Sequence, residues 1–125
     1  MALKALLDSV ILIDHFNNVP EASQFILDLI PGETAISVIT RAEILVGFES
    51  SKITLVKAFL DQYETLPIDK TAADEAADLR RTHGWKLPDA LQAALAILHR
   101  LRFYTRNTKD FDPRKHPFVE IPYRI

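Results

Sequence analysis

Short apolar segments alternate with helical segments along the whole chain, and this alternation constrains the fold more than any other feature of the sequence. The apolar runs at 3–7, 34–37, 66–68, 102–105 and 118–121 have the length of strands. Strands that alternate with helices predict a parallel sheet with helices on both faces. We therefore expect an α/β fold, a three-layer α/β/α sandwich with a mainly parallel sheet of about four or five strands.

Hydrophobic periodicity and boundary residues place the helices between these runs. The predicted helices span 9–16, 20–30, 38–49, 51–64, 71–83 and 88–101. Gly84 is expected to end the fifth of them. Ile39, Ala42 and Val46 are spaced to form the buried face of the third. Prolines flank the last apolar run, which predicts a strand at the edge of the sheet.

Length and composition limit the classes of protein that fit. The 125 residues suffice for one hydrophobic core, so we expect a single domain over 1–125. The absence of cysteine excludes disulfides, thiolate zinc sites and a cysteine nucleophile. No apolar run approaches the roughly 20 residues of a membrane span, and no signal peptide is visible. A cytoplasmic protein with no membrane partner is expected.

Charge is distributed unevenly along the chain. Residues 1–78 hold 5 Lys/Arg and 13 Asp/Glu, whereas residues 79–125 hold 10 and 4. The net charge of −2 argues against a protein that coats nucleic acid. The acidic part is suited to binding cations, and the basic part to following phosphates.

Four acidic residues lie where a parallel sheet places its chemistry, at the carboxyl ends of strands. Asp8 and Asp110 follow predicted strands, while Glu43 and Asp89 lie in early helix turns. Each has a structural explanation by itself: a helix cap for Asp8, a capping box with Thr40 for Glu43, the helix dipole for Asp89 and an ordinary loop for Asp110. Alternatively, Ser37 caps the third helix and leaves Glu43 inside it, near the buried stripe. Together the four acids predict a pocket for Mg²⁺, which binds carboxylates, waters and phosphate.

The sequence resembles the PIN-domain ribonucleases and, within them, the VapC-type toxins. The resemblance rests on four segments: LLDSVILID at 6–14, ISVITRAEI at 36–44, KLPDALQAA at 86–94 and TRNTKDF at 105–111. Each segment is weak alone, but their order and spacing are specific. They run from near the start of the chain to near its end, so the resemblance covers the whole chain.

The resemblance implies a catalytic site and a reaction. Its catalytic acids are Asp8, Glu43, Asp89 and Asp110, with Asp8 and Asp89 as direct ligands of Mg²⁺ or Mn²⁺. Ser9, Thr105 and Asn107 are the expected supporting residues, and Asn107 is placed to share or take the role of Asp110. The implied activity is metal-dependent endonucleolytic hydrolysis of RNA that leaves a 5′-phosphate. A homodimer and a small protein antitoxin that blocks the acidic pocket are the implied partners.

Other polar and aromatic residues suggest secondary roles. Arg106 and Lys109 flank the proposed site and are predicted to bind RNA phosphates; the alternative is a solvated surface strip. Trp85 can stack on a base or pack on the core. The four histidines show no close metal-binding pair in their spacing, which disfavours a metal-independent histidine ribonuclease.

Two other functional classes remain open. PIN relatives commonly carry Thr and then Asn or Ser after the first aspartate, where this chain has Ser9 and Val10. Loss of that polar group fits a PIN-like module that binds RNA or protein without cleaving. The second class is a magnesium-dependent, receiver-like signalling domain. It predicts one phosphorylatable aspartate and no nuclease activity.

Overall fold

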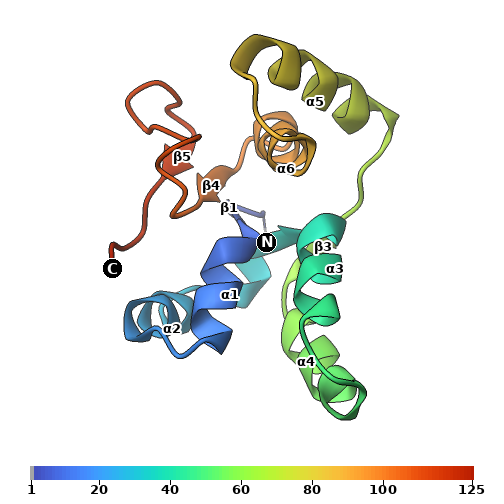
Figure 1. Cartoon of the computed structure of the whole chain (residues 1–125), viewed down its shortest axis with the longest axis vertical. Coiled ribbons are helices and arrows are strands. Elements are labelled where there is room, and N and C mark those ends of the chain that lie inside the picture. The colour runs from blue at the N-terminus through green and yellow to red at the C-terminus, as the bar shows by residue number, and fades with distance from the viewer. Residues whose placement is uncertain (1) are drawn as a thin grey trace.

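A parallel sheet forms the centre of the structure (Figure 1), a computed structural model that describes residues 2–125. Within these residues the sheet has five strands in the order β3-β2-β1-β4-β5, and all neighbours pair in parallel. The strands are β1 (Ala5–Leu7), β2 (Thr34–Ser37), β3 (Glu64–Leu66), β4 (Arg102–Tyr104) and β5 (Val119–Glu120). The predicted parallel sheet and its proline-flanked edge strand are confirmed.

Helices cover both faces of this sheet, which confirms the three-layer sandwich (Figure 1). They are α1 (Ser9–Phe16), α2 (Pro20–Leu27), α3 (Val38–Val46), α4 (Ile53–Leu60), α5 (Lys70–His83) and α6 (Leu87–Leu98). Helices α5 and α6 lie on one face, and α1 to α4 lie on the other.

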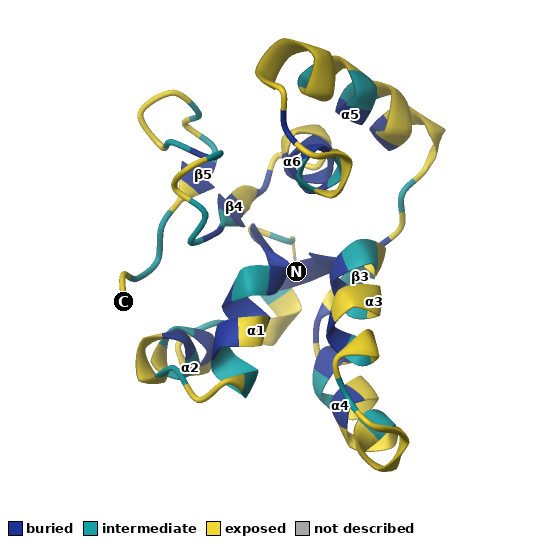
Figure 2. Ribbon diagram, in the orientation of Figure 1, coloured by how far each residue is buried: buried dark blue, intermediate teal, exposed yellow. Residues whose placement is uncertain are grey.

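Alternation of side chains along the strands divides the core into two clusters. Leu6 and Ala35 pack in the cluster under α5 and α6, whereas Leu7 and Ile36 pack with α1, α3 and α4. Successive strand residues point to opposite faces, so each central strand supplies both clusters. Figure 2 shows the resulting dark band of buried residues at the centre, with exposed residues on the outer faces of the helices.

Strand order reverses between β1 and β4, because β2 and β3 lie on one side of β1 while β4 and β5 lie on the other. Such a switch point leaves a crevice at the carboxyl ends of the strands, where ligands bind in α/β folds. Leu7 pairs with Tyr104, and the backbone N–H of Asp8 donates to the carbonyl of Tyr104 at 2.9 Å. The residues that follow β1 and β4 therefore meet at this crevice.

Two helix boundaries follow the expected capping chemistry. The Ser37 hydroxyl accepts a hydrogen bond from the backbone N–H of Thr40 at 3.1 Å, so α3 begins after Ser37. Gly84 ends α5 with a φ of +71°, in the left-handed region that suits glycine. The start at Ser37 places Glu43 inside α3 and excludes its role in a capping box with Thr40.

Several predicted boundaries are wrong. Helix α4 ends at Leu60 and β3 spans Glu64–Leu66, where a helix to 64 and a strand over 66–68 were predicted. The apolar spacing continues through Tyr63, so helical periodicity conceals a short edge strand. The predicted ends of the helices at 30, 49 and 101 come instead at Leu27, Val46 and Leu98.

The predicted buried face of α3 is also wrong. Thr40 and Ile44 are its buried residues, whereas Val46 is 86% exposed. The helix packs along a stripe set by its start after Ser37, and Val46 lies at its last turn, beyond that stripe. No helix within residues 2–125 is long and apolar enough to cross a bilayer.

Candidate functional site

Asp8 lies at the switch point of the sheet and is 6% exposed. It occupies the N-cap position of α1, yet its side chain makes no capping hydrogen bond. Instead, the Thr105 hydroxyl donates to Oδ2 of Asp8 at 2.7 Å, and the Ser9 hydroxyl donates to Oδ1 at 3.4 Å. The carboxylate is therefore held by the residue that follows β4, and the helix-cap explanation does not account for it.

The environment of Asp8 disfavours an isolated negative charge. Burial raises the pKa of Asp8, the hydrogen bond from Thr105 lowers it, and the charge of Glu43 raises it further, with a net upward shift. A buried carboxylate is stable as a charge only with a hydrogen-bonding or cationic partner. Thr105 supplies part of that stabilisation, and a cation would supply the rest.

Asp89 approaches the same crevice from the opposite layer. It lies half-buried in the first turn of α6, the helix that leads into β4 and so begins at the carboxyl edge of the sheet. Burial raises the pKa of Asp89, and the charges of Asp8 and Asp110 raise it further, while Lys86 opposes them. Carboxylates from two other segments of the chain therefore act on Asp89.

Asp110 is held by a short hydrogen-bonded loop after β4. The Asn107 side-chain amide donates to Oδ2 of Asp110 at 2.9 Å, and the backbone N–H of Asp110 donates back to Asn107 Oδ1 at 3.3 Å. The backbone N–H of Asn107 donates to the Thr105 hydroxyl at 3.0 Å. A chain of bonds thus runs from Asp8 through Thr105 and Asn107 to Asp110, so the amide and the acid form one unit.

Trp85 fixes the same loop from the α5–α6 connection. Its indole N–H donates to the backbone carbonyl of Asp110 at 2.9 Å, and its ring is 4% exposed and packs against Phe111. A ring this buried cannot stack on a nucleic-acid base, so its packing role is confirmed. Ring centroids of His83 and His116 lie 5.0 Å apart beside it, a proximity that sequence spacing did not reveal.

Glu43 lies inside α3 and is exposed, not buried as its apolar neighbours in sequence suggested. It lines a cavity of about 240 Å³ whose walls include Phe16, Ile44 and Phe48. Its charge nevertheless reaches Asp8, because it contributes to the raised pKa of that residue. Glu43 therefore stands at the solvent side of the acidic crevice, at the end of an apolar groove between α1 and α3.

Arg106, predicted to bind RNA, has an internal partner. Its guanidinium donates to both carboxylate oxygens of Asp14, at 2.6 and 2.9 Å, and the Tyr123 hydroxyl donates to Asp14 at 2.7 Å. Sequence reasoning missed Asp14, although an acid after the apolar run 10–13 was a signal of a buried pair. Lys109 is exposed; RNA binding by either residue stays a prediction.

Gln92 is a second polar residue that sequence reasoning missed. It is 2% exposed, and its amide donates to the Thr40 hydroxyl at 2.6 Å. Thr40 and Gln92 lie one turn from Glu43 and Asp89 on their respective helices, so the bond ties together the two helices that carry these acids. Within the described residues, Oε1 of Gln92 is buried without a hydrogen-bond partner.

The donor set fits a hard divalent cation bound with water. Among residues 2–125, no group of three or more histidine or acidic side chains is close enough to hold an ion by itself. Mg²⁺ usually keeps several waters and binds one or two protein carboxylates. Asp8 and Asp89 supply that number of oxygen ligands. Burial raises the pKa of both residues, and the charge of Asp8 raises that of Asp89 further, so a positive charge at this site would be favoured.

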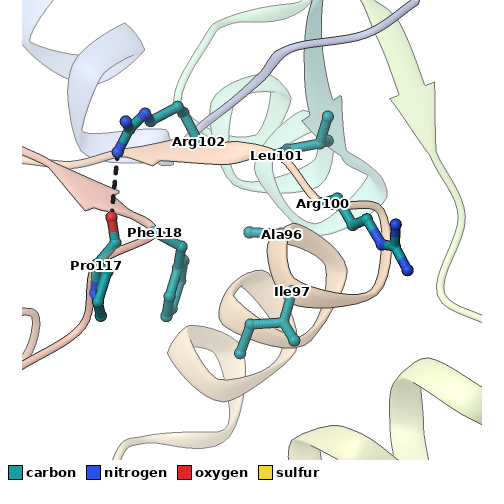
Figure 3. Close-up of a pocket in the computed structure, with 7 residues that line it drawn as sticks. All are labelled: Ala96, Ile97, Arg100, Leu101, Arg102, Pro117 and Phe118. Carbon is teal, nitrogen blue, oxygen red and sulfur yellow. Dashed lines mark hydrogen bonds between the residues drawn. The ribbon is translucent and has the colours of Figure 1, made fainter.

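A cavity of about 560 Å³ lies at the opposite edge of the sheet, where α6 turns into the start of β4 (Figure 3). Ile97, Phe118, Arg100 and Arg102 are among its lining residues, and no acidic side chain lines it. The carboxylates and this larger cavity therefore occupy different ends of the molecule.

The doubly wound parallel sheet and the carboxylates at its switch point define an α/β protein with an acidic site suited to a divalent cation. The chain belongs to the PIN-domain family, whose model matches residues 5–115. No curated protein matches the chain.

Solved structures give the same assignment. The chain is similar to a toxin–antitoxin complex from Klebsiella pneumoniae, with 39% identity, a TM-score of 0.90 and coverage of 98% of this chain and 100% of the other. It is also similar to DNA-bound VapBC from Salmonella typhimurium (26% identity, TM-score 0.72, coverage 97% and 99%). FitAcB from Neisseria gonorrhoeae shares the fold at 24% identity, a TM-score of 0.78 and full coverage of both chains. These neighbours bear out the resemblance to VapC-type toxins that the four sequence segments indicated.

Proposed function

We propose that the chain is a cytoplasmic, metal-dependent endoribonuclease, a single PIN-like nuclease domain that acts as the toxin of a toxin–antitoxin pair. The observation that carries this proposal is the state of Asp8. It is buried at the switch point of the sheet, makes no capping bond and is held by Thr105. Its charge and that of Asp110 both raise the pKa of Asp89.

The residues of the crevice have distinct tasks in this reaction. Asp8 and Asp89 bind the Mg²⁺ or Mn²⁺ ion, and Thr105 and Ser9 orient the carboxylate of Asp8. Glu43 and Asp110 complete the acidic wall, with Asn107 bonded to Asp110. When bound, the cation supplies a Lewis acid for the scissile phosphate and lowers the pKa of a water molecule that attacks it.

The test is cleavage of end-labelled single-stranded RNA with Mn²⁺ or with EDTA. We expect wild-type protein to cleave only with metal and to leave 5′-phosphate ends, and we expect Asp8→Asn and Asp89→Asn to lose cleavage. Asp61→Asn is the matched control, because Asp61 lies between α4 and β3, outside the crevice, and pairs with Arg41 at 2.8 Å. Equal cleavage in EDTA, or in both site variants, contradicts the proposal.

The same assay separates the two alternatives. A module without catalysis binds the RNA but leaves it intact, and a receiver-like domain takes up phosphate on one aspartate from a small phosphodonor. Val10 is partly buried and packs against the core on the α1 side. Its apolar character therefore has a structural reason that does not require loss of activity.

The proposed partner is a small protein antitoxin that places a basic side chain among the acids. Two observations support it: the 39% identical structure is a toxin–antitoxin complex, and an apolar groove leads to Glu43. Expression of the chain alone should arrest growth, and co-expression of the adjacent small gene should relieve the arrest. Arrest that no neighbouring gene relieves contradicts this partner.

A homodimer is proposed as the unbound state. Val46 on α3 is 86% exposed and Leu55 on α4 is 76% exposed, which suits an interface more than a solvated surface. Sedimentation equilibrium should give twice the mass of 14.2 kDa, and Val46→Glu should shift the protein toward monomer. A wild-type monomer at all concentrations contradicts this state.

A further inference from the structure

Two cavities open beside the loop that carries Asp110, and both are lined by Thr108 and Arg124. One has a volume of about 180 Å³ and is also lined by Arg106 and Tyr123. The other, of about 420 Å³, is also lined by Arg114 and its partner Asp112. Thr108 and Arg124 therefore stand between the two cavities, and we call the two cavities together the tail groove.

The tail groove lies at the same edge of the sheet as the acidic crevice. Thr108 belongs to the loop after β4, and Arg124 belongs to the segment after β5. Both strands are parallel to β1, so both segments leave the sheet at the carboxyl edge, where Asp8 is found. The loop that supplies Thr108 also supplies Asp110, so the groove and the proposed cleavage site share this loop.

Charge pairing in the tail groove leaves one arginine for a ligand. Asp14 is bonded to Arg106 and Tyr123, and Asp112 is bonded to Arg114. Within residues 2–125, Arg124 has no acidic group within ion-pair distance, and the Thr108 hydroxyl makes no hydrogen bond. A cationic donor and a hydroxyl without protein partners match the needs of a phosphate group.

We infer that the tail groove is a backbone-phosphate subsite for single-stranded RNA, with Arg124 and Thr108 as the groups that contact the phosphate. The inference rests on the proposed ribonuclease function. Arg106 lines this subsite without contacting the phosphate, because its two hydrogen bonds to Asp14 hold the guanidinium against α1. The subsite holds the RNA strand where it leaves the acidic crevice.

The cavity with Arg100 and Arg102 (Figure 3) is the competing phosphate site. There Arg102 already donates to the carbonyl of Pro117 at 3.1 Å and lies 3.7 Å from Glu120. The cavity is at the amino edge of the sheet, far in the fold from the crevice, so a strand cut at Asp8 has no direct route to it. Arg100 is exposed and provides a matched control with the same loss of charge.

The test is the salt dependence of binding to a short single-stranded RNA, measured by fluorescence anisotropy with Ca²⁺ in place of Mn²⁺. We expect Arg124→Ala to lower the slope of log K against log salt by about 0.7, the value for one lost phosphate contact on a single strand. That change corresponds to about fivefold weaker binding at 0.1 M salt. Arg124→Lys should keep the slope. Thr108→Val should weaken binding without changing the slope.

Control variants distinguish a phosphate subsite from general surface charge. Arg100→Ala and Arg102→Ala should leave the slope within error of wild type, since both residues line the cavity at the other edge of the sheet. An unchanged slope in Arg124→Ala, an equal loss in either control, or no saturable binding by wild type overturns the inference.

Cleavage measured in parallel with Mn²⁺ keeps the two proposals apart. If wild type cleaves RNA and Arg124→Ala has an unchanged slope, the ribonuclease proposal is supported and the subsite is contradicted. If the slope of Arg124→Ala falls as expected but wild type does not cleave RNA, the subsite is supported and the ribonuclease proposal is contradicted. Arg124 is exposed, so a thermal melt should show Arg124→Ala folded as wild type.

Discussion

Two opposing effects act on the negative charge of Asp89. A carboxylate in the first turn of a helix is favoured by the helix dipole, by about 0.3–1 kcal/mol. Burial and the charges of Asp8 and Asp110 act against it and raise the pKa of Asp89. If the dipole effect is larger, Asp89 stabilises the metal-free protein. If the repulsion is larger, Asp89 destabilises the metal-free protein and its role is to bind the cation.

We expect Asp89→Asn to melt a few degrees higher than wild type without metal and to gain less from Mn²⁺. The amide keeps the shape of the side chain and removes one of three repelling charges. Bound cation should raise the stability of wild type by about 2.7 kcal/mol at a hundredfold excess over its dissociation constant. Thermal melts with EDTA and with Mn²⁺ measure both effects. A lower melting point with an intact Mn²⁺ shift would remove Asp89 from the site.

We expect Trp85→Phe to reduce the rate of RNA cleavage while costing only about 1 kcal/mol of stability. Phenylalanine retains an apolar ring beside Phe111 but loses the hydrogen bond to the carbonyl of Asp110. The loop that carries Asp110 should loosen, so kcat should fall with little change in KM. Urea unfolding and steady-state kinetics measure the two effects. A variant with wild-type kcat would show that the bond does not position Asp110.

The connection between α5 and α6 depends on one backbone conformation. Gly84 has a φ of +71° and its backbone N–H donates to the carbonyl of Arg80 at 2.8 Å. A Cβ at this position would meet no atom within 4 Å, so the restriction is in the backbone and not in packing. The turn directs the chain to Trp85 and then to Asp89, which links helix termination to the site.

We expect Gly84→Ala to lower the free energy of unfolding by about 1–2 kcal/mol, the cost of a left-handed conformation for an ordinary residue. Gly84→Asn should cost less, because asparagine tolerates this conformation. Urea unfolding of the three proteins gives the comparison. Equal stability of the glycine and alanine forms would mean that the turn adopts another conformation in solution.

At the scale of the whole molecule, Asp14 joins parts of the chain that are distant in sequence. Its partners Arg106 and Tyr123 are 92 and 109 residues away. Burial raises the pKa of Asp14, but the hydrogen bonds from Arg106 and Tyr123 and the guanidinium charge outweigh burial, and the net pKa is lowered. Helix α1, the loop after β4 and the C-terminal segment are therefore held together by one ionised carboxylate.

The sign of the pH dependence follows from this lowered pKa. The Asp14 contribution to stability is present above its unfolded pKa of 3.8 and is lost as pH falls through the lower folded pKa. We expect Arg106→Ala to cost about 1–3 kcal/mol at neutral pH and to make stability fall less steeply below pH 4. Arg114→Ala, whose partner Asp112 pairs at the surface, should leave neutral stability unchanged. An acid profile of Arg106→Ala that matches wild type contradicts the role of Asp14.

Local chemistry in the sequence was sufficient for the alternation of elements, the end of α5 at Gly84 and the placement of Asp8 and Asp110 after strands. For the start of α3 it left two candidate caps, Ser37 and Thr40, and the structure has Ser37. These features depend on periodicity, capping and turn preferences, which act over a few neighbouring residues. The parallel sheet followed from the alternation itself. The acids could therefore be assigned to one edge of the sheet before their contacts were known.

Tertiary structure alone decided which distant residues became partners. The exposure of Val46, the bounds of β3, the pairing of Arg106 with Asp14 and the burial of Trp85 all depend on strand order and on how each helix packs. The residues next to Arg106 in the sequence do not indicate whether its side chain faces solvent or pairs with Asp14, which is 92 residues away. Long-range pairing depends on the free energy of the whole packed molecule. Local sequence patterns could therefore identify Asp8 and Asp89 as candidate site residues, but they could not identify the residues that contact them.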